Sequence, residues 1–291
     1  MTNDLREILP TIRALFQNKN SGIYKESEIN KLLRQAEKNW GKGQSLSAKN
    51  LIDRITSEPR LRKIILKSKK YENIIRYTYG KVSPYQIGLS LKPDSYLSHG
   101  TAAYLHGLAA QEPKIIYVNK EQSPKPSPAG PLSQEGIKRA FANKQKVSQY
   151  VFSHRGYSYT VLSGKHSNRL GVEKREDSLG NPIEVAGIER TLIDIAVRPQ
   201  YAGGVSQVLS AYSKARNRIS VDTIVDTLAR LDYIYPYHQV IGFYMARAGY
   251  PKKNTSALQN LGLDFDFYLD YAMAEPAYDE EWRLFYPKEF S

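Results

Sequence analysis

Apolar side chains in the first sixty residues recur at helical spacing. In residues 5–16, 28–40 and 45–60 they lie three and four positions apart, which places them on one face of a helix. Ser45 or Ser47 is suited to cap the third of these helices, because serine oxygens accept hydrogen bonds from free N–H groups in the first turn. The pattern therefore predicts three consecutive helices.

Two shorter runs, residues 61–67 and 73–80, are rich in β-branched and aromatic residues and flank a polar, basic segment. This arrangement predicts a β-hairpin with a basic tip. Three helices and a hairpin are typical of a winged helix-turn-helix, which lays its third helix in the major groove of DNA and its hairpin on the backbone. Other small α+β domains fit the same pattern, so that alternative stays open. Pro84 favours a domain boundary at residue 83.

Beyond residue 83 the pattern predicts a larger domain, residues 84–291, which mixes strands with helices and ends in helices. The expected fold class is α+β, with a winged helix-turn-helix over residues 1–83 and a mixed α/β C-terminal domain. Four prolines indicate an exposed loop in residues 119–136. Strands are expected at residues 85–91, 113–118, 150–154, 157–163, 182–187 and 264–271, and helices at residues 136–146, 190–199, 205–216, 220–231 and 236–249.

The positive charge is concentrated near the start of the chain. Residues 1–81 hold 18 Lys and Arg against 8 Asp and Glu, whereas residues 82–263 hold 22 against 13 over more than twice the length. Residues 264–291 are acidic, with 2 against 8. A dense positive charge near phosphates releases condensed counterions, so the N-terminal domain is expected to bind a polyanion. A merely soluble basic surface is the alternative.

Cysteine is absent, which excludes disulfides and thiolate metal sites and favours a reducing compartment. Residues 1–10 carry acids where a secretory signal is basic, and no apolar run reaches the roughly 18 residues of a membrane span. We therefore expect a cytoplasmic protein with no membrane partner.

The first domain supplies the candidate DNA contacts. On the third helix, Lys49, Asn50 and Arg54 share the side opposite the apolar face; Asn suits adenine edges, and Arg suits guanine or phosphate. Phosphate contacts are expected from the start of this helix and from the wing. These further residues are Lys42, Ser45 and Ser47 at the helix start, Lys67, Lys69, Lys70 and Tyr71 in the wing, and Arg60, Arg62 and Lys63 beside it.

The segment YLSHGTAAYLHGL, residues 96–108, holds two histidines seven positions apart. Two helical turns separate His99 from His106 by roughly 10 Å, which is too far for one metal ion. A helical zinc site needs ligands four apart or a further carboxylate nearby. The segment is therefore interpreted as a core helix, capped by Ser98, with two hydrogen-bonded histidines and no metal.

The same segment carries a resemblance to a family. Together with IERTLIDIAVRPQYAGGVSQVLSAYSKA, residues 188–215, and YIYPYHQVIGFYMARAGY, residues 233–250, it resembles the AbiEi antitoxins of bacterial abortive-infection systems. The resemblance extends over nearly the whole chain, but none of these segments is an active-site signature. The connection between the second and third predicted helices is longer than expected, which affects the register of the third helix.

The resemblance implies an autorepressor that binds double-stranded DNA at inverted repeats upstream of its own operon. It also implies an antitoxin, paired with a nucleotidyltransferase-like toxin encoded beside it, with the antitoxin activity in the C-terminal domain. Conspicuous basic positions in that domain are candidates for this activity: Arg169, Lys174, Arg175 and Arg190.

Two other functions remain as alternatives. A metal-dependent nuclease would need carboxylates and a lysine that converge on magnesium, but Glu173 and Lys174 are adjacent and point oppositely in a strand. Glu189 and Asp194, on either side of Arg190, fit a helix start and an ion pair four residues apart. A purely architectural protein that binds DNA without sequence preference is the other alternative. No glycine-rich phosphate loop is present, so neither an enzyme activity nor a cofactor is expected.

Overall fold

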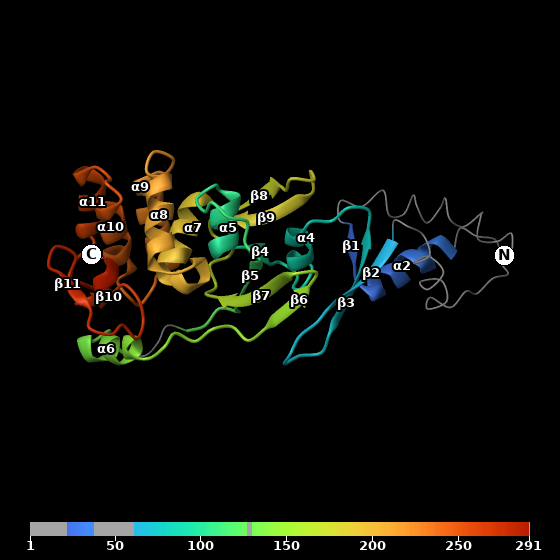
Figure 1. The fold of residues 1–291 in the computed structure, drawn as a ribbon, viewed down its shortest axis with the longest axis horizontal. Coiled ribbons are helices and arrows are strands. Elements are labelled where there is room, and N and C mark those ends of the chain that lie inside the picture. The colour runs from blue at the N-terminus through green and yellow to red at the C-terminus, as the bar shows by residue number, and fades with distance from the viewer. Residues whose placement is uncertain (1–21, 38–60, 127–129, 291) are drawn as a thin grey trace.

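The structure is a computed structural model that describes residues 22–37, 61–126 and 130–290. The described elements form an elongated arrangement (Figure 1). A small three-stranded sheet with helix α2 lies at one end, a six-stranded sheet lies in the middle, and a group of helices with the C-terminus lies at the other end. The described chain thus mixes α and β structure throughout.

The three-stranded sheet contains the predicted hairpin. Strands β2 (Leu61–Leu66) and β3 (Ile74–Tyr79) pair antiparallel, as the two β-rich runs predicted. A short strand that was not predicted, β1 (Ile23–Tyr24), pairs with the other edge of β3. Helix α2 (Glu26–Glu37) confirms the second predicted helix, and its Ile29 is fully buried. The first and third predicted helices lie outside the described residues.

The six-stranded sheet is mixed, in the order β6-β7-β5-β4-β9-β8. The β5–β7 and β4–β9 pairs are parallel, and the other pairs are antiparallel. Its strands are β4 (Tyr96–Leu97), β5 (Ile115–Glu121), β6 (Val151–His154), β7 (Tyr157–Gly164), β8 (Val172–Glu176) and β9 (Pro182–Ala186).

The strand predicted at residues 85–91 is wrong, because this segment forms helix α4 (Pro84–Leu89). Ser83 Oγ accepts from the N–H of Gln86, and the Gln86 side chain accepts from the N–H of Ser83. This reciprocal cap, with Pro84 in the first turn, starts a helix locally and outweighs the alternating apolar pattern.

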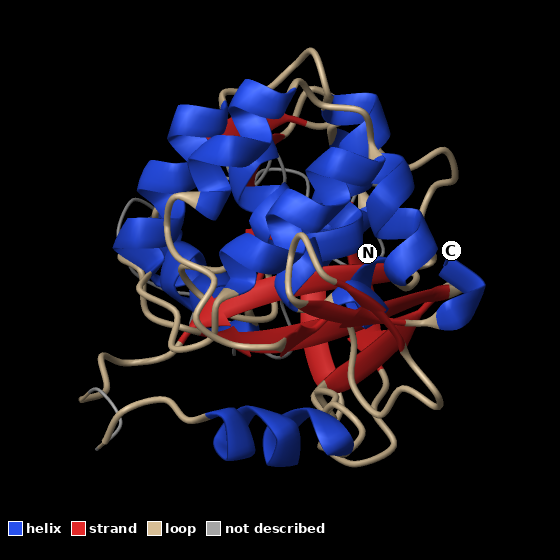
Figure 2. Ribbon diagram, turned by 90° about the vertical axis from the view of Figure 1, so that its left-hand side faces the viewer, coloured by secondary structure: helices blue, strands red, loops and turns tan. Residues whose placement is uncertain are grey.

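Helices α4 and α5 (His99–Leu105) lie on opposite faces of the central sheet. Gly88 of α4 packs against Ile116 and Val118, whereas Gly100 of α5 packs near Tyr117. Neighbouring residues of a strand point to opposite faces, so the two helices are separated by β5. Helix α7 (Ile188–Val197) packs beside α5, and in Figure 2 most helices gather on one side of the red strands.

The segment from α7 to α11 is mainly helical, as predicted, but three short strands follow these helices. Ser220 caps α9, since its Oγ accepts from the N–H of Thr223. The strand expected at residues 264–271 is reduced to β10 (Phe267–Tyr268) in a small sheet of order β10-β12-β11. The remaining elements are α6 (Gln134–Ala142), η1 (Pro199–Ala202), α8 (Val205–Ala215), α9 (Val221–Leu231), α10 (Tyr237–Arg247), α11 (Lys252–Gln259), β11 (Ala277–Asp279), β12 (Leu284–Tyr286) and η2 (Lys288–Phe290).

Two hydrophobic clusters stabilise the molecule. One lies among the C-terminal helices, and the other, the sheet cluster, joins the hairpin to the central sheet. Ile64 and Leu66 of β2 belong to the sheet cluster together with Ile87 and Phe152. The apolar core is therefore continuous across residue 83, where the sequence favoured a boundary.

A β-bridge also joins the two sheets. The N–H of Lys67 donates to the carbonyl of Ser153 at 3.0 Å, and the N–H of Ser153 donates to the carbonyl of Lys67 at 2.8 Å. Strand β2 of the hairpin is thus attached to β6, the edge strand of the central sheet.

Candidate nucleic-acid interface

The outer face of the hairpin presents lysines to solvent. Lys63 and Lys67 are exposed, and Ile65 between them is 42% exposed. Ile64 and Leu66 point to the other side of the strand and are buried in the sheet cluster. The alternation of β2 therefore decides which side chains are accessible to a ligand.

Hydrogen bonds from side chains to the backbone order the hairpin tip. Asn73 Oδ1 accepts from the N–H of Ser68 at 3.2 Å, and Ser68 Oγ accepts from the N–H groups of Lys70 and Tyr71, both at 3.3 Å. Serine and asparagine favour such local bonds in turns. Lys69 and Lys70 are therefore exposed on an ordered turn.

The exposed cations of the hairpin have no acidic partner among the described residues. None of them forms an ion pair with a described Asp or Glu side chain. The exposed cations of the hairpin are Arg62, Lys63, Lys67, Lys69 and Lys70. A cluster of like charges is unfavourable by itself, and a polyanion that displaces counterions relieves the repulsion.

The hairpin is braced against the edge of the central sheet along one side. The Tyr71 ring packs edge-on against Tyr150, with 4.8 Å between ring centres, and Tyr71 remains 46% exposed. His154 Nδ1 donates to the carbonyl of Ile65 at 3.1 Å. Tyr71, predicted as a wing contact, therefore holds the hairpin in place.

Arg76 of β3 makes a second link, to the C-terminal end of helix α4. It is 8% exposed, and its Nε and Nη2 both donate to the carbonyl of Ser90, at 3.1 and 2.8 Å. Its Nη1 donates to its neighbour Ile75. Burial lowers the pKa of Arg76, an effect that Glu28 opposes. Arg76 is thus a structural cation and is separate from the exposed ones.

Part of the predicted DNA-contact set lies outside the described residues. These residues are Lys42, Ser45, Ser47, Lys49, Asn50, Arg54 and Arg60. The structure brings together the remaining members, which all belong to the hairpin: Arg62, Lys63, Lys67, Lys69, Lys70 and Tyr71.

The basic positions proposed for the C-terminal domain do not form one surface. Arg169 is bound to Glu184, with 2.8 Å between Nη2 and Oε2. Lys174 and Arg175 are both exposed, but they are neighbours in β8 and point to opposite faces. Arg175 Nη1 donates to His106 Nδ1 at 3.1 Å. The single surface expected from the sequence is therefore not present.

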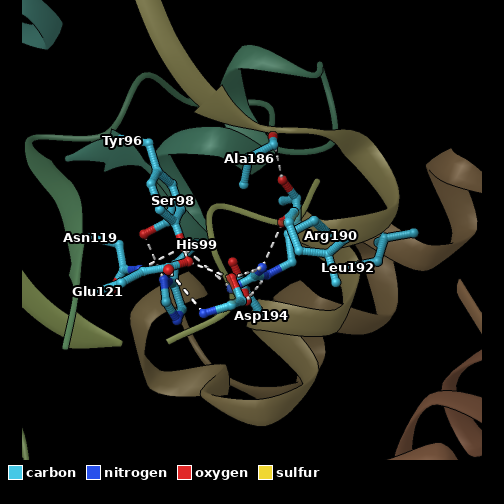
Figure 3. A network of polar contacts seen from close by, with 12 residues as sticks. Tyr96, Ser98, His99, Asn119, Glu121, Ala186, Arg190, Leu192 and Asp194 are labelled. Atoms are coloured by element: carbon cyan, nitrogen blue, oxygen red, sulfur yellow. Dashed lines mark hydrogen bonds and ion pairs between the residues drawn. The ribbon is translucent and has the colours of Figure 1, made fainter. Parts of the chain in front are cut away.

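Arg190 is the clearest correction, because it is buried and is not a surface residue. Its side chain is 4% exposed, and its Nε donates to Asp194 Oδ1 at 2.8 Å. Its Nη1 donates to the carbonyl of Leu170 at 2.7 Å and to Ser167 Oγ at 3.2 Å. Burial lowers the pKa of Arg190, but Asp194, Tyr96 and Tyr233 together outweigh burial and raise it. Figure 3 shows this pair at the centre of a polar network.

Tyr96 extends that network across the sheet. Its hydroxyl accepts from Asn119 Nδ2 at 2.7 Å and from Arg190 Nη2 at 3.3 Å, and it donates to Glu121 Oε1 at 3.3 Å. Glu121 also accepts from the N–H and the hydroxyl of Ser167. Polar groups buried in this way need partners to offset lost hydration, so the network fixes how α7 sits on the sheet.

Both histidines of residues 96–108 are buried and hydrogen-bonded, as predicted. His99 Nδ1 lies 2.9 Å from Ser98 Oγ, and burial lowers the pKa of His99 to about 4. His106 Nε2 donates to the carbonyl of Ala186 at 2.7 Å. Ser98 occupies the cap position, but its side chain makes no capping hydrogen bond, because it is bonded to His99.

Sequence reasoning missed three exposed cations beside the hairpin: Lys81, Lys114 and Arg155. Arg155 lies in the turn between β6 and β7 and lines two hollows. It shares one with Arg62 and the other with Lys67, both of the hairpin. The Arg155–Gly156 pair between two alternating strands is a turn signal in the sequence, but its proximity to the hairpin depends on tertiary packing.

No family model matches this chain, and no curated protein does. Among solved structures, the fold is similar to the crystal structure of the RV2827C protein from Mycobacterium tuberculosis, with a TM-score of 0.58 and 14% sequence identity. The similarity covers 94% of this chain and 89% of that chain. At this identity the likeness concerns the fold alone.

Residues 22–37, 61–126 and 130–290 contain no group of three or more His, Asp or Glu side chains that could hold a metal ion. Over the same ranges, every helix is too short or too polar to cross a bilayer.

Proposed function

We propose that this protein binds double-stranded DNA and acts as a transcriptional repressor and antitoxin. The observation that carries the proposal is the group of exposed hairpin cations that have no described acidic partner. Lysines on an ordered hairpin suit phosphate contacts, which supply most of the affinity of DNA-binding proteins.

The mode of binding that we propose is that of a winged helix-turn-helix. Helix α2 precedes the hairpin, and the amphipathic pattern of residues 45–60 predicts a third helix with Lys49, Asn50 and Arg54 on its polar side. In this mode the third helix reads base edges, and Lys69 and Lys70 touch the backbone. Attachment of the hairpin to the second domain favours a fixed wing, which limits the entropy lost on binding.

The antitoxin part of the proposal rests on the resemblance of residues 96–108, 188–215 and 233–250 to the AbiEi family. On that basis the DNA target is a set of inverted repeats upstream of the operon. The functional partner is a nucleotidyltransferase-like toxin encoded beside this chain. Because Arg190 is buried and Arg169 is paired with Glu184, the exposed candidates for antitoxin activity are Lys174 and Arg175.

A gel-shift experiment with the upstream DNA tests the repressor function. We expect the full chain to retard this fragment and to prefer it over a scrambled fragment. Lys69→Ala/Lys70→Ala should weaken binding, whereas Lys252→Ala/Lys253→Ala should not. The control pair is also exposed and adjacent, but it lies on α11 at the other end of the molecule (Figure 1).

A growth assay tests the antitoxin function separately. Cells that express the neighbouring toxin should recover when this chain is co-expressed. Loss of rescue in Lys174→Ala/Arg175→Ala, with DNA binding intact, would place the activity in the second domain. Binding of both fragments with equal affinity and no rescue would favour the architectural alternative, and magnesium-dependent nicking would favour the nuclease.

A further inference from the structure

A hollow of about 720 Å³ lies between the hairpin and the second domain. Its walls come from the hairpin, from the segment that follows β3 into α4, and from the turn between β6 and β7. Small-molecule sites commonly occupy junctions of this kind and have volumes of roughly 300–1,000 Å³. The hollow is therefore of the right size for a metabolite.

The described charged residues of this hollow are all cationic. Arg62, Lys81 and Arg155 line it, and no Asp or Glu of residues 22–37, 61–126 and 130–290 does. Each of the three is exposed, and none forms an ion pair with a described residue. Arginine and lysine donors in a cluster without counter-charge suit a phosphate group, since charge-assisted hydrogen bonds are about twice as strong as neutral ones.

The rest of the lining is apolar and aromatic. Ile64, Ile87 and Tyr159 are buried and form its floor, while Tyr157 is half-buried. Leu179 lies at the rim and is 48% exposed. A ligand that covers this wall therefore needs a planar or apolar part in addition to its phosphate.

Arg155 is held in an unusual backbone conformation. Its φ is 46°, and Gly156 follows with φ 80°, so both residues of the two-residue β6–β7 turn are left-handed. Such turns favour Asn, Asp or Gly, and a left-handed arginine costs roughly 1–2 kcal/mol. Strain of this kind gathers at functional sites. A cation is therefore present at the mouth of the hollow despite a conformational cost.

We propose that this hollow binds a nucleoside phosphate. The phosphate lies against Arg155, Lys81 and Arg62, and the base lies on the wall that contains Tyr157 and Leu179. This site is independent of the proposed DNA contacts except for Arg62, which borders both. Because one wall is the hairpin itself, a bound nucleotide would stand next to the proposed wing.

Calorimetric titration of the full chain with AMP and GMP tests the proposal, with adenosine and inorganic phosphate as partial ligands. We expect both nucleotides to bind and each partial ligand to bind at least about tenfold more weakly. Arg155→Ala and Lys81→Ala should each weaken nucleotide binding about tenfold, the value of one charge-assisted hydrogen bond. Leu179→Glu should weaken binding because it replaces the apolar surface under the base with a hydrated charge, and Lys252→Ala should leave binding unchanged.

Several results would overturn the proposal. Absence of heat at millimolar nucleotide is one, and binding that is insensitive to Arg155→Ala, Lys81→Ala and Leu179→Glu is another. Equal affinity for inorganic phosphate would indicate an anion site without base recognition. A short DNA duplex that loses affinity in these variants, while AMP and GMP do not bind, would assign the cations to DNA. DNA binding by the hairpin stands or falls separately, because Lys69 and Lys70 do not line this hollow.

Discussion

Arg190 and Asp194, one turn apart on α7, form an ion pair in which the two side chains are only 4% and 6% exposed. The pair lies 2.8 Å apart and is surrounded by further donors and acceptors from the central sheet. Since a buried charge without its partner is very unfavourable, the two residues depend on one another.

Arg190→Met should therefore lower the free energy of unfolding by about 3–5 kcal/mol, because it leaves the Asp194 carboxylate buried and unpaired. Arg230→Met is the matched control. Arg230 pairs with Asp226 at the same spacing on α9, but those side chains are 61% and 66% exposed. Exposed pairs contribute less than about 1 kcal/mol. Urea unfolding of both variants measures the difference, and equal losses would refute the structural role of the buried pair.

His99 makes stability depend on pH. Burial lowers its pKa to about 4, whereas the unfolded chain has a value near 6.5. Between these values the unfolded state binds the extra proton, so stability is complete above about pH 6.5 and decreases as the pH falls towards 4. The contribution of His99 to the free energy of unfolding should fall by about 2 kcal/mol between pH 7 and pH 5.

His99→Asn isolates this contribution. The φ of His99 is 50°, and asparagine is among the residues that tolerate this left-handed conformation. The variant should show a smaller loss of stability than the wild type between pH 7 and pH 5 in urea titrations. The pH dependence of the free energy of unfolding that remains in the variant comes partly from His106 and His238, whose pKa values are also lowered by burial. Identical slopes in variant and wild type would contradict the assignment.

The sequence predicted the local features of this fold better than its long-range contacts. The hairpin follows from two β-rich runs that flank a polar, basic segment, and the cap of α9 follows from Ser220. Helix α4 was missed because its Ser83–Gln86 cap outweighs an alternating pattern. Such errors concern a few residues and are correctable from the sequence itself.

The candidate site is different, because its composition depends on tertiary packing. Arg190 has one partner on its own helix, but Ser167 and Tyr96 come from distant segments. The residues around Arg190 in the sequence therefore could not predict its burial. Likewise Lys81 and Arg155 are far apart in sequence and share the hollow beside the hairpin. Sequence patterns identified the hairpin cations, whereas the fold identified the cations beside them.

Gly242 of α10 lies directly against the ring of Trp282. A Cβ atom at this position would stand 2.0 Å from Trp282 Cζ3, and the indole is 1% exposed. A rigid, buried ring cannot move aside cheaply, so Gly242→Ala should destabilise the protein by about 3 kcal/mol. Thermal and urea unfolding measure this loss.

Gly136→Ala is the control for that substitution. Gly136 also lies in a helix, α6, but its Cβ would meet only the Ser133 hydroxyl, at 3.1 Å. This substitution should change stability by less than about 1 kcal/mol, because alanine favours the helix. A Gly242→Ala variant as stable as Gly136→Ala would show that the indole shifts without cost.

The salt dependence of DNA binding tests the proposed hairpin contacts quantitatively. If about six phosphates are neutralised, the logarithm of the affinity should fall with the logarithm of salt concentration at a slope of about −5. Lys69→Ala/Lys70→Ala should make this slope shallower by about 1–2, because each lost phosphate contact removes about 0.9. Fluorescence anisotropy of labelled DNA measures the affinity at salt concentrations from about 50 to about 200 mM, and these affinities give the slope.

The matched pair Lys252→Ala/Lys253→Ala removes the same charge from α11 and should leave the slope unchanged. This comparison separates a local contact from a general effect of net charge, since both variants lose two positive charges from a chain of formal net charge +13. A shallower slope for the hairpin variant alone supports phosphate contacts at Lys69 and Lys70. Equal changes of slope in both variants would mean that DNA binding depends on the net charge of the protein. A flat slope in the wild type would mean that the hairpin does not contact phosphates.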